Sequence, residues 1–367
     1  MNHESITFQR AAWRRLKKNK GAVFGLIVIG LAVLVVVFAY FISPDPSPNA
    51  NRIILEIGGE KPGFTKTFVL LPKARKPAAT NFLKKLVSGK EDRYDFVPVN
   101  GYKMVGSDSI RVYRFIDEVT QDTVLYATNG ASSGFIKSNI KEKKFLLGTD
   151  KFGRDILSRL IVGTRVSLSV GLITVIISLS IGLILGSLAG YFRGRTDNII
   201  MWFINVIWSI PTLLLVFAIT LALGKGFWQV FIAVGLTMWV SVARLVRGQV
   251  LSAREQEYVE ATRALGFSNI RTIVRHIWPN IMGPVMVIAA SNFASAIVIE
   301  AGLSFLGVGV QPPMPSWGLM IKENYNFIIT QNPMLALAPG FAIMLLVLAF
   351  NLLGNGLRDA LNVRGRL

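Results

Sequence analysis

The chain has 367 residues, of which 52% are hydrophobic, and it carries a formal net charge of +19. Its mean hydropathy of +0.49 is rare among soluble domains and predicts a polytopic membrane protein. The absence of cysteine excludes disulfides, cysteine-bound zinc and thiol nucleophiles. Only His3 and His276 could supply imidazole, and neither has neighbours at metal-ligand spacing. We therefore expect no catalytic residue, metal site or cofactor in this chain, and we attribute its charge to contact with membrane lipid rather than with nucleic acid.

A basic, amphipathic segment occupies residues 1–20, and an apolar segment follows at 21–44. In the first segment, Phe8 and Trp13 stand among arginines and lysines, which predicts a helix along the cytoplasmic membrane surface. A disordered basic tail is the alternative. The apolar run is too long for a signal peptide, and no small-residue cleavage pattern follows it. We interpret it as a first transmembrane helix over residues 21–42.

Residues 45–145 differ in kind, because they are rich in charge and contain no long apolar run. Strand-like stretches recur between turn-rich pieces such as Gly58-Gly59 and Asn129-Gly130. We predict a small β-rich domain on the extracytoplasmic side. It could be a docking surface for a solute-delivering partner, a lid over a pore, or a stabilising outer loop. The predicted strands are Arg52–Ile57, Thr67–Leu71, Ile110–Phe115 and Thr123–Ala127.

A membrane-spanning helix needs roughly 20 mostly apolar residues, and five further spans are predicted within residues 146–367. Pro211 lies inside one of them and should kink it, because proline cannot donate the helical hydrogen bond. The predicted fold class is an all-α polytopic membrane protein with six transmembrane helices and a small β-rich extracytoplasmic insert. The further spans lie at about 166–190, 199–223, 227–243, 281–305 and 334–356, and the one at 227–243 is short.

Basic residues predict the orientation through the positive-inside rule. They cluster before the first span, in a polar connector at about 244–280, and after the last span, whereas the short loops on the other side carry few. We therefore expect a multi-pass protein of the plasma (inner) membrane with both termini cytoplasmic and residues 45–145 extracytoplasmic. The basic residues outside the connector include Arg10, Arg14, Arg15, Lys17, Lys18, Lys20, Arg193, Arg195, Arg358, Arg364 and Arg366.

Two features inside the predicted spans concern packing and polarity. Gly182, Gly186 and Gly190 are spaced four residues apart, so that they share one side of a helix and let a neighbouring backbone approach closely. Glu300 is the one carboxylate well inside a predicted span, and it should face the protein interior or an aqueous cavity. Its side chain could pair with a polar group on a neighbouring helix or contact a translocating solute.

The polar connector has the pattern of two short helices with a sharp turn between them. Ser252 is a candidate N-cap with Glu255 at the capping-box position, which predicts a helix over residues 252–265. Gly266 can adopt a positive φ and end that helix, and Ser268 can cap the next one.

Three further residues of the connector suit a docking role. Glu260 could pair with an arginine of a partner, Ala261 is small enough to let a partner surface approach, and Pro279 helps to begin the fifth span. A hairpin that only rests on the membrane would fit the same pattern.

The connector resembles the EAA loop of ABC importer permeases. Glu260-Ala261-Thr262-x3-Gly266 and Ile277-Trp278-Pro279 match its pattern of Glu-Ala-Ala-x3-Gly followed by Ile-x-Leu-Pro. Thr262 and Trp278 are mild departures from that pattern. The resemblance implies that the loop forms a coupling helix that inserts into a groove of an ATPase subunit, with Glu260, Ala261 and Gly266 at the matching positions.

Two more segments narrow the resemblance to one type of permease subunit. Residues 147–155 (LGTDKFGRD) continue into Ser158-Arg159-Leu160, and residues 303–307 (LSFLG) are followed by Pro315-Ser316-Trp317-Gly318. Together they resemble the second, or C-type, permease subunit of dipeptide, oligopeptide and nickel importers. The resemblance covers the N-terminal segment and residues 147–367, whereas residues 45–145 depart from it.

This resemblance implies a type I ABC importer fold and a set of partner chains. The partners are a second homologous permease subunit, two ATPase subunits that bind ATP and Mg²⁺, and an extracytoplasmic solute-binding protein. The implied function is to form half of a pore for dipeptides or oligopeptides, with ATPase coupling through the 257–279 loop. A permease for nickel or another small solute remains an alternative.

The sequence contains no Gly-x4-Gly-Lys-Ser/Thr phosphate-binding loop, so that ATP hydrolysis must come from another chain and this subunit is expected to be non-catalytic. An ion-gradient-driven secondary transporter is the main alternative, and it would usually carry more intramembrane charge than Glu300. A membrane enzyme would need a catalytic constellation that the sequence does not display. A receptor-like protein would not need the connector.

Overall fold

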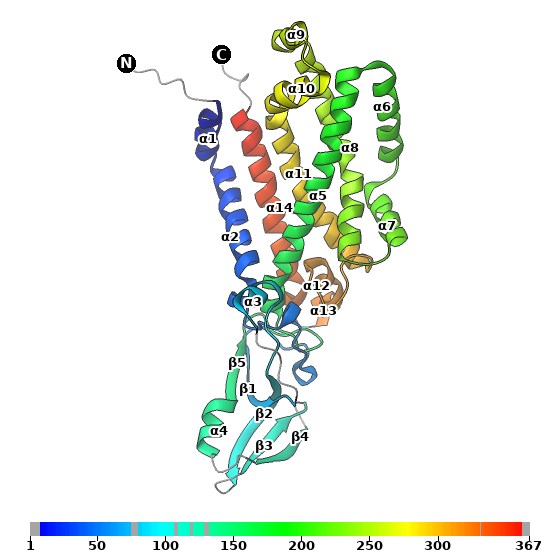
Figure 1. Ribbon diagram of the computed structural model, residues 1–367. Helices are drawn as coiled ribbons and strands as arrows, with labels where there is room; N and C mark the ends of the chain where they lie inside the picture. Colours follow the sequence, from blue (N-terminus) through cyan, green and yellow to red (C-terminus); the bar gives the residue numbers. More distant parts are fainter. Residues whose placement is uncertain are drawn as a thin grey trace, which may run out of the picture. The chain divides into compact units, whose positions relative to one another are not determined.

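The computed structural model describes residues 8–74, 80–105, 109–117, 120–127, 132–330 and 332–361. The sequence-based interpretations that involve His3, Asn129-Gly130, Arg364 and Arg366 lie outside these residues. The chain divides into two compact units (Figure 1). The first unit comprises Met1–Val33, Ser167–Gln311 and Phe341–Leu367, and the second comprises Leu34–Val166 and Pro312–Gly340.

Five helical segments among the described residues are long and apolar enough to cross a membrane, and a sixth candidate is a bent pair of helices. The prediction of a mostly helical, polytopic membrane protein is therefore confirmed, with five spans, or six if the bent pair is one span. The five are α2 (Lys20–Ile42), α5 (Ile156–Phe192), α8 (Phe227–Arg254), the run of α10 (Asn269–Thr272) into α11 (Trp278–Leu306), and α14 (Met334–Leu361).

The bent pair consists of α6 (Gly194–Trp208) and α7 (Thr212–Leu223), which meet at an angle of 91°. The sequence predicted a single kinked span over 199–223, but the helix stops before Pro211 and a new one starts after it. Proline lacks the N–H that a helix interior needs and disfavours helical geometry in the residue before it. The chain therefore turns sharply here instead of bending slightly.

Helix α8 is longer than predicted. It passes the expected end at residue 243 and continues to Arg254, because Val242, Val246 and Val250 are buried at helical spacing along one side. Ser252 consequently lies inside α8, and the predicted N-cap at this residue is wrong.

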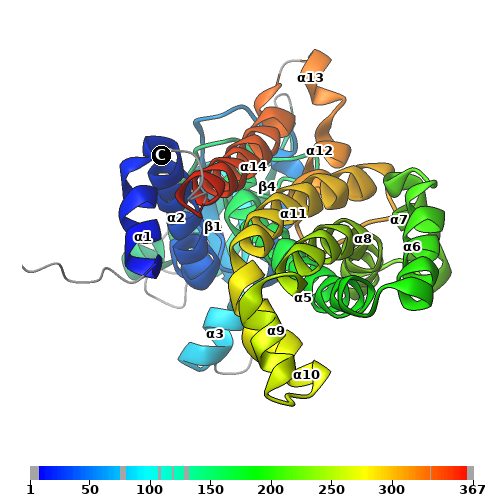
Figure 2. The ribbon, with the colours of Figure 1, turned by 90° about the horizontal axis from the view of Figure 1, so that it is seen from above.

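Helices α5 and α8 lie side by side, as Figures 1 and 2 show, and the glycines of α5 face α8. A Cβ atom at Gly182 would lie 2.5 Å from the Cβ of Val242, and one at Gly186 would lie 2.5 Å from the carbonyl oxygen of Ala243. At Gly190 the nearest atom would be the carbonyl oxygen of Arg247, at 2.8 Å. No side chain larger than hydrogen fits at this contact.

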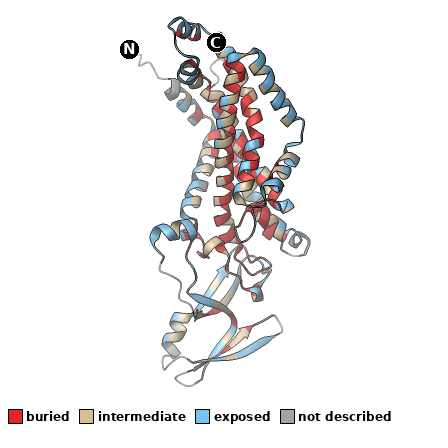
Figure 3. Ribbon diagram, turned by 45° about the vertical axis from the view of Figure 1, so that its right-hand side comes forward, coloured by how far each residue is buried: buried red, intermediate tan, exposed pale blue. Residues whose placement is uncertain are grey.

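The long helices bury one side and expose apolar residues on the other, as the burial colours of Figure 3 show. Helix α2 is an extreme case, since it is almost wholly apolar and yet leaves most of its side chains at least partly exposed. Such outward apolar surface is expected where a helix contacts lipid.

Helix α1 (Phe8–Lys18) agrees with the predicted amphipathic helix over its described residues. Its Leu16 packs with Ala22 and Ala360, and the side-chain amide of Asn19 donates to a carboxylate oxygen of Asp359 at 3.3 Å. In the first unit, α1 and the C-terminal end of α14 therefore lie at the same end (Figure 1).

The second unit contains a five-stranded antiparallel sheet with strand order β4-β3-β2-β1-β5, which confirms a small β-rich insert. The strands predicted at 67–71, 110–115 and 123–127 fall within β1, β3 and β4, but the one at Arg52–Ile57 is wrong, because a 3-10 turn forms at Leu55–Ile57. The strands are β1 (Phe64–Pro72), β2 (Tyr94–Val105), β3 (Ser109–Phe115), β4 (Gln121–Ala127) and β5 (Ile140–Phe145).

Short helices complete the second unit. Two of them connect strands of the sheet, and two lie in the later stretch of this unit, Pro312–Gly340. They are α3 (Phe82–Ser88), α4 (Ser132–Asn139), α12 (Trp317–Asn324) and α13 (Phe327–Thr330).

The contact between α5 and α8 predicts that Gly186→Leu lowers the stability of the chain. The added side chain must displace the backbone at Ala243 or the side chain of Val246, which costs about 1–3 kcal/mol. The thermal unfolding midpoint in detergent should fall accordingly. The control is Gly248→Leu in α8, where a Cβ would meet no atom within 4 Å; equal midpoints for both variants would contradict the packing argument.

Candidate functional site

The connector between α8 and α11 folds into a helical hairpin. Its first helix, α9 (Glu257–Ala264), begins after Gln256 and is terminated by Leu265 and Gly266, the latter with a φ of +74°. The N–H of Gly266 donates to the carbonyl of Arg263 at 2.9 Å, and the N–H of Phe267 donates to that of Thr262 at 3.0 Å. This pair of bonds is a Schellman motif, in which glycine is favoured because of its positive φ.

The second half of the hairpin leads directly into a membrane span. The side chain of Ser268 accepts the N–H of Arg271 and so caps α10, as the sequence predicted. A π-helical turn at Ile273–Ile277 joins α10 to α11, and Pro279 occupies the first turn of α11, where its missing N–H is tolerated. The hairpin is therefore a continuation of α11 and not a separate loop.

One side of α9 is exposed and the other is packed against α10. Glu260 and Ala261 are exposed, whereas Val259 and Thr262 are buried. The hydroxyl oxygen of Thr262 lies 3.3 Å from that of Thr272. The exposed side thus presents a carboxylate next to a small residue, which is the arrangement expected of a docking surface.

The two departures from the EAA pattern both make contacts that hold the hairpin. Thr262 donates to the carbonyl of Val259 at 2.7 Å as well as facing Thr272. The indole N–H of Trp278 donates to the hydroxyl of Ser187 in α5 at 2.9 Å. Sequence reasoning missed both contacts, because a local sequence pattern does not show which side chains meet when the chain folds.

Further bonds fasten the hairpin to the end of α5. The hydroxyl of Tyr191 donates to the side chain of Asn269 at 3.0 Å, and the guanidinium of Arg254 donates to the carbonyl of Tyr191 at 2.6 Å. Arg193 forms a hydrogen-bonded ion pair with Glu255, which lowers the pKa of that carboxyl. Glu255 therefore pairs with Arg193, whereas the sequence predicted a capping box for it.

Glu300 lies fully buried in α11. Its carboxylate accepts the hydroxyl of Ser304, one turn later in the same helix, at 2.6 Å. The Ser304 oxygen in turn accepts the N–H of Val310 at 3.0 Å. Ser304 thus joins Glu300, on the same helix, to the turn that follows α11.

A cavity of about 520 Å³ lies in the first unit beside α11. Its lining includes residues on both sides of the break between α6 and α7, and it contains no Asp, Glu, Lys or Arg; Glu300 is not among the lining residues. Its polar side chains are all neutral hydrogen-bonding groups, and they come with one tryptophan. They are Trp208, Thr212, Thr237, Ser241, Asn292, Ser295 and Asn351.

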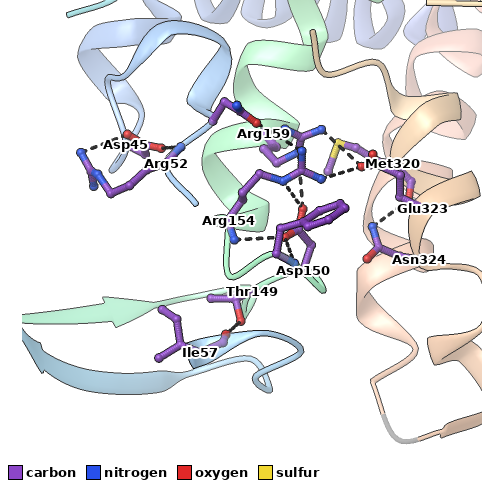
Figure 4. Close-up of polar contacts among 12 residues, drawn as sticks. Asp45, Arg52, Ile57, Thr149, Asp150, Arg154, Arg159, Met320, Glu323 and Asn324 are labelled. Carbon is purple, nitrogen blue, oxygen red and sulfur yellow. Dashed lines mark hydrogen bonds and ion pairs between the residues drawn. The ribbon is translucent and has the colours of Figure 1, made fainter. Parts of the chain in front are cut away.

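A buried ionic cluster lies in the second unit, where residues 149–159 meet α12 (Figure 4). Asp150 accepts the Nε of Arg154 at 2.6 Å, and the other side of that guanidinium donates to Glu323 at 2.7 Å. Arg159 is fully buried and lies at ion-pair distance from both carboxylates, 3.8 Å from Asp150 and 3.5 Å from Glu323. Two arginines therefore balance two carboxylates in a largely buried site.

Most of the cluster comes from residues 149–159, which stood out in the sequence only for their resemblance to importer permeases. Asp150 also accepts the backbone N–H groups of Phe152 and Arg154, at 2.9 and 3.0 Å, which shapes the turn before α5. Next to it, burial raises the pKa of Asp155, although hydrogen bonds from Ser158 oppose this shift. The available signal was the group of charged residues between 150 and 165, shortly before a predicted apolar span, because buried charges must find partners.

A metal site in this chain would need several histidine or acidic side chains close together. Within the described part of the chain, no group of three or more histidine or acidic side chains could hold a metal ion.

The fold defines a polytopic integral membrane protein, and comparison with known proteins identifies its family. A family model described as the binding-protein-dependent transport system inner membrane component matches residues 182–366. A second one, described as the N-terminal TM domain of oligopeptide transport permease C, matches residues 7–55. The chain belongs to the family of inner membrane components of binding-protein-dependent transport systems.

Curated relatives agree with this family. The chain is 43% identical over 216 residues to the glutathione transport system permease protein GsiD of Pectobacterium atrosepticum, which covers 59% of this chain and 71% of the relative. It is 41% identical over 224 residues to the oligopeptide transport system permease protein OppC of Bacillus subtilis, covering 61% and 73%. It is 43% identical over 215 residues to the dipeptide transport system permease protein DppC of Alkalihalophilus pseudofirmus, covering 59% and 70%.

Family membership confirms several predictions. The chain is a multi-pass permease subunit of the ABC transporter class in the inner membrane, and it is the membrane component rather than the catalytic one. An ATPase and a binding protein are implied as partners, and no cofactor is expected in this chain. Residues 56–181 lie in neither family match.

The ionic cluster predicts that Glu323→Gln strongly destabilises the chain. The substitution leaves two buried guanidinium groups with one carboxylate, and breaking a buried pair in this way costs about 3–5 kcal/mol. The thermal unfolding midpoint of the purified chain measures this loss. The control is Asp95→Asn, which removes a 63% exposed partner of Lys73 and should cost no more than about 1 kcal/mol. A midpoint for Glu323→Gln no lower than that of the control would refute the interpretation.

Proposed function

We propose that the chain is one of two non-identical permease subunits of an ATP-driven importer for short peptides. The relatives are named for the transport of oligopeptides, dipeptides and glutathione, and glutathione is itself a modified tripeptide. In this proposal a second homologous permease completes the pore, two ATPase subunits supply the energy, and an extracytoplasmic protein delivers the solute.

The observation that carries the coupling mechanism is the exposed pair Glu260-Ala261 on a firmly held helix. The hairpin continues into α11 through the π-helical turn and is hydrogen-bonded to α5 through Tyr191 and Trp278. A force applied to α9 therefore acts on two membrane helices at once. We assign to Glu260 the pairing with a basic side chain of the ATPase, and to Ala261 the close approach of the two surfaces.

The proposed topology follows from charge. In the first unit, α1, the hairpin and the C-terminal end of α14 lie at one end (Figure 1), where basic side chains are abundant. By the positive-inside rule we assign this end to the cytoplasm, and the predicted order of the spans then assigns residues 45–145 to the extracytoplasmic side. The basic residues at this end include Arg14, Arg15, Lys17, Lys18, Arg193, Arg195, Arg254, Arg263, Arg271, Arg275 and Arg358.

The cavity beside α11 is proposed to form part of the solute path. Neutral hydrogen-bonding groups such as Asn292 and Ser295 can contact peptide amide groups, which every peptide carries. A lining without ionised groups neither attracts nor repels charged side chains of the solute. Such a surface suits a pore that passes peptides of varied sequence, and this observation favours peptides over a metal ion as the solute.

Glu260→Arg is predicted to abolish recruitment of the ATPase subunits. Reversal of an interfacial charge costs about 2–5 kcal/mol, so that recovery of ATPases with the tagged chain should fall by about tenfold or more. Mass spectrometry of the complex purified in mild detergent measures this loss, and the second permease should still be recovered.

The matched control is Glu142→Arg, the same substitution at an exposed position of β5. It should leave ATPase recovery unchanged. Equal recovery with Glu260→Arg would refute the assigned coupling residue, and recovery of the unaltered chain without a second permease or an ATPase would refute the proposed importer.

Ser295→Trp is predicted to block peptide uptake without loss of the complex. The indole would occupy part of the cavity, and Ser295 is exposed there, so that the fold has room for the change. Uptake of a labelled dipeptide by cells measures the block. Leu172→Trp, at an exposed position of α5, serves as the control, and unimpaired uptake by the Ser295 variant would exclude the cavity from the path.

A further inference from the structure

Helix α3 is a seven-residue helix that buries none of its side chains. Its large apolar residues are strongly exposed, with 65% of Phe82, 71% of Leu83 and 66% of Val87 accessible. It lies within residues 56–181, which neither family match includes. A run of exposed apolar side chains on so short a helix indicates a surface that something else covers.

The position of α3 is fixed by bonds at its C-terminal end. The guanidinium of Arg165 donates to the carbonyl oxygens of Leu86 and Val87, at 2.8 and 2.9 Å. These carbonyls belong to the last turn of the helix, where a cation is favourable. The N–H of Lys90 then donates to the carbonyl of Pro46 at 2.8 Å. The helix is thus held where the chain leaves the end of α2.

The side chains of α3 contact the last turn of α2. The rings of Phe41 and Phe82 lie 5.3 Å apart, and the ammonium group of Lys85 lies 4.2 Å from the centre of the Phe41 ring. Phe41 and its neighbour Ile42 are exposed apolar residues at the end of α2. Residues 7–55 match a transmembrane domain, so that the exposed side of α2 is a lipid-facing surface, and the apolar residues of α3 extend it.

The charge of α3 fits the same environment. Lys84 lies in α3 next to Leu83, and Lys90 follows the end of the helix; both lysines are exposed. A helix with apolar residues on one side and lysines beside them is typical of the boundary between acyl chains and anionic headgroups. Lysine can place its ammonium group at the headgroups while its carbon chain stays in apolar surroundings.

We propose that α3 lies in the membrane interface, in the leaflet at which α2 ends, and anchors the β-rich insert to the lipid. Phe82, Leu83 and Val87 enter the acyl boundary, and Lys84 and Lys90 contact lipid phosphates. The proposal depends on α2 being a membrane span and is independent of the solute. Its consequence is that the insert is held at the membrane by α3 in addition to the two spans that flank it in sequence, α2 and α5.

The test uses the fact that the chain contains no cysteine. In Leu83→Cys the single thiol is labelled with an environment-sensitive fluorophore, and the full chain, with the subunits that copurify, is reconstituted into nanodiscs of phosphatidylethanolamine and phosphatidylglycerol. We expect a blue-shifted emission, loss of fluorescence with lipids that carry a nitroxide just below the headgroup, and little loss with aqueous iodide. Val87→Cys should behave in the same way.

Two controls bracket the result. Leu34→Cys, at an exposed apolar position of α2, should lose fluorescence with nitroxide lipids, and Leu125→Cys, at an exposed position of β4, should lose it with iodide only. Loss with iodide alone at residue 83 would overturn the proposal in favour of a water-exposed helix. Loss with neither quencher would overturn it in favour of a protein partner that covers α3.

Discussion

The close backbone contact between α5 and α8 is the constraint on which the first unit depends. Gly182, Gly186 and Gly190 bring the two helices together along three turns, and the end of α5 then supplies the groups that hold the hairpin. Tyr191 and Ser187 lie in the last two turns of α5 and bond to Asn269 and Trp278. The glycine contact therefore places the end of α5, and polar side chains at that end position the exposed face of α9.

Much of this arrangement could be predicted from local sequence. The glycine spacing, the helix end at Gly266 and the cap at Ser268 all follow from rules that act over a few residues. The end of α8 could not be predicted in this way, because Arg247 suggested a polar loop. Its guanidinium instead pairs with Asp197 of α6, fifty residues away in sequence, at 2.5 Å. Charges whose partners are distant in sequence give no local signal of whether they lie in a helix or a loop.

The second unit shows the same limit more strongly. Strand β5 has the sequence IKEKKF, and its charges concealed a strand whose hydrogen bonds go to β1. The ionic cluster depends on Glu323, which is 169 residues from Arg154. A carboxylate at such a distance becomes recognisable as a partner only in the folded chain, although the need for one follows from the cost of burying an arginine.

The π-helical turn at Ile273–Ile277 makes the orientation of the hairpin depend on the exact length of the connector. A π turn accommodates one residue more than an α-helix does over the same rise, and each residue turns a helix by about 100°. The direction in which Glu260 points is therefore set by the number of residues between Gly266 and Pro279 as well as by their identity. Gain or loss of a single residue in this interval would rotate the proposed coupling surface away from its partner while leaving every side chain on it unchanged.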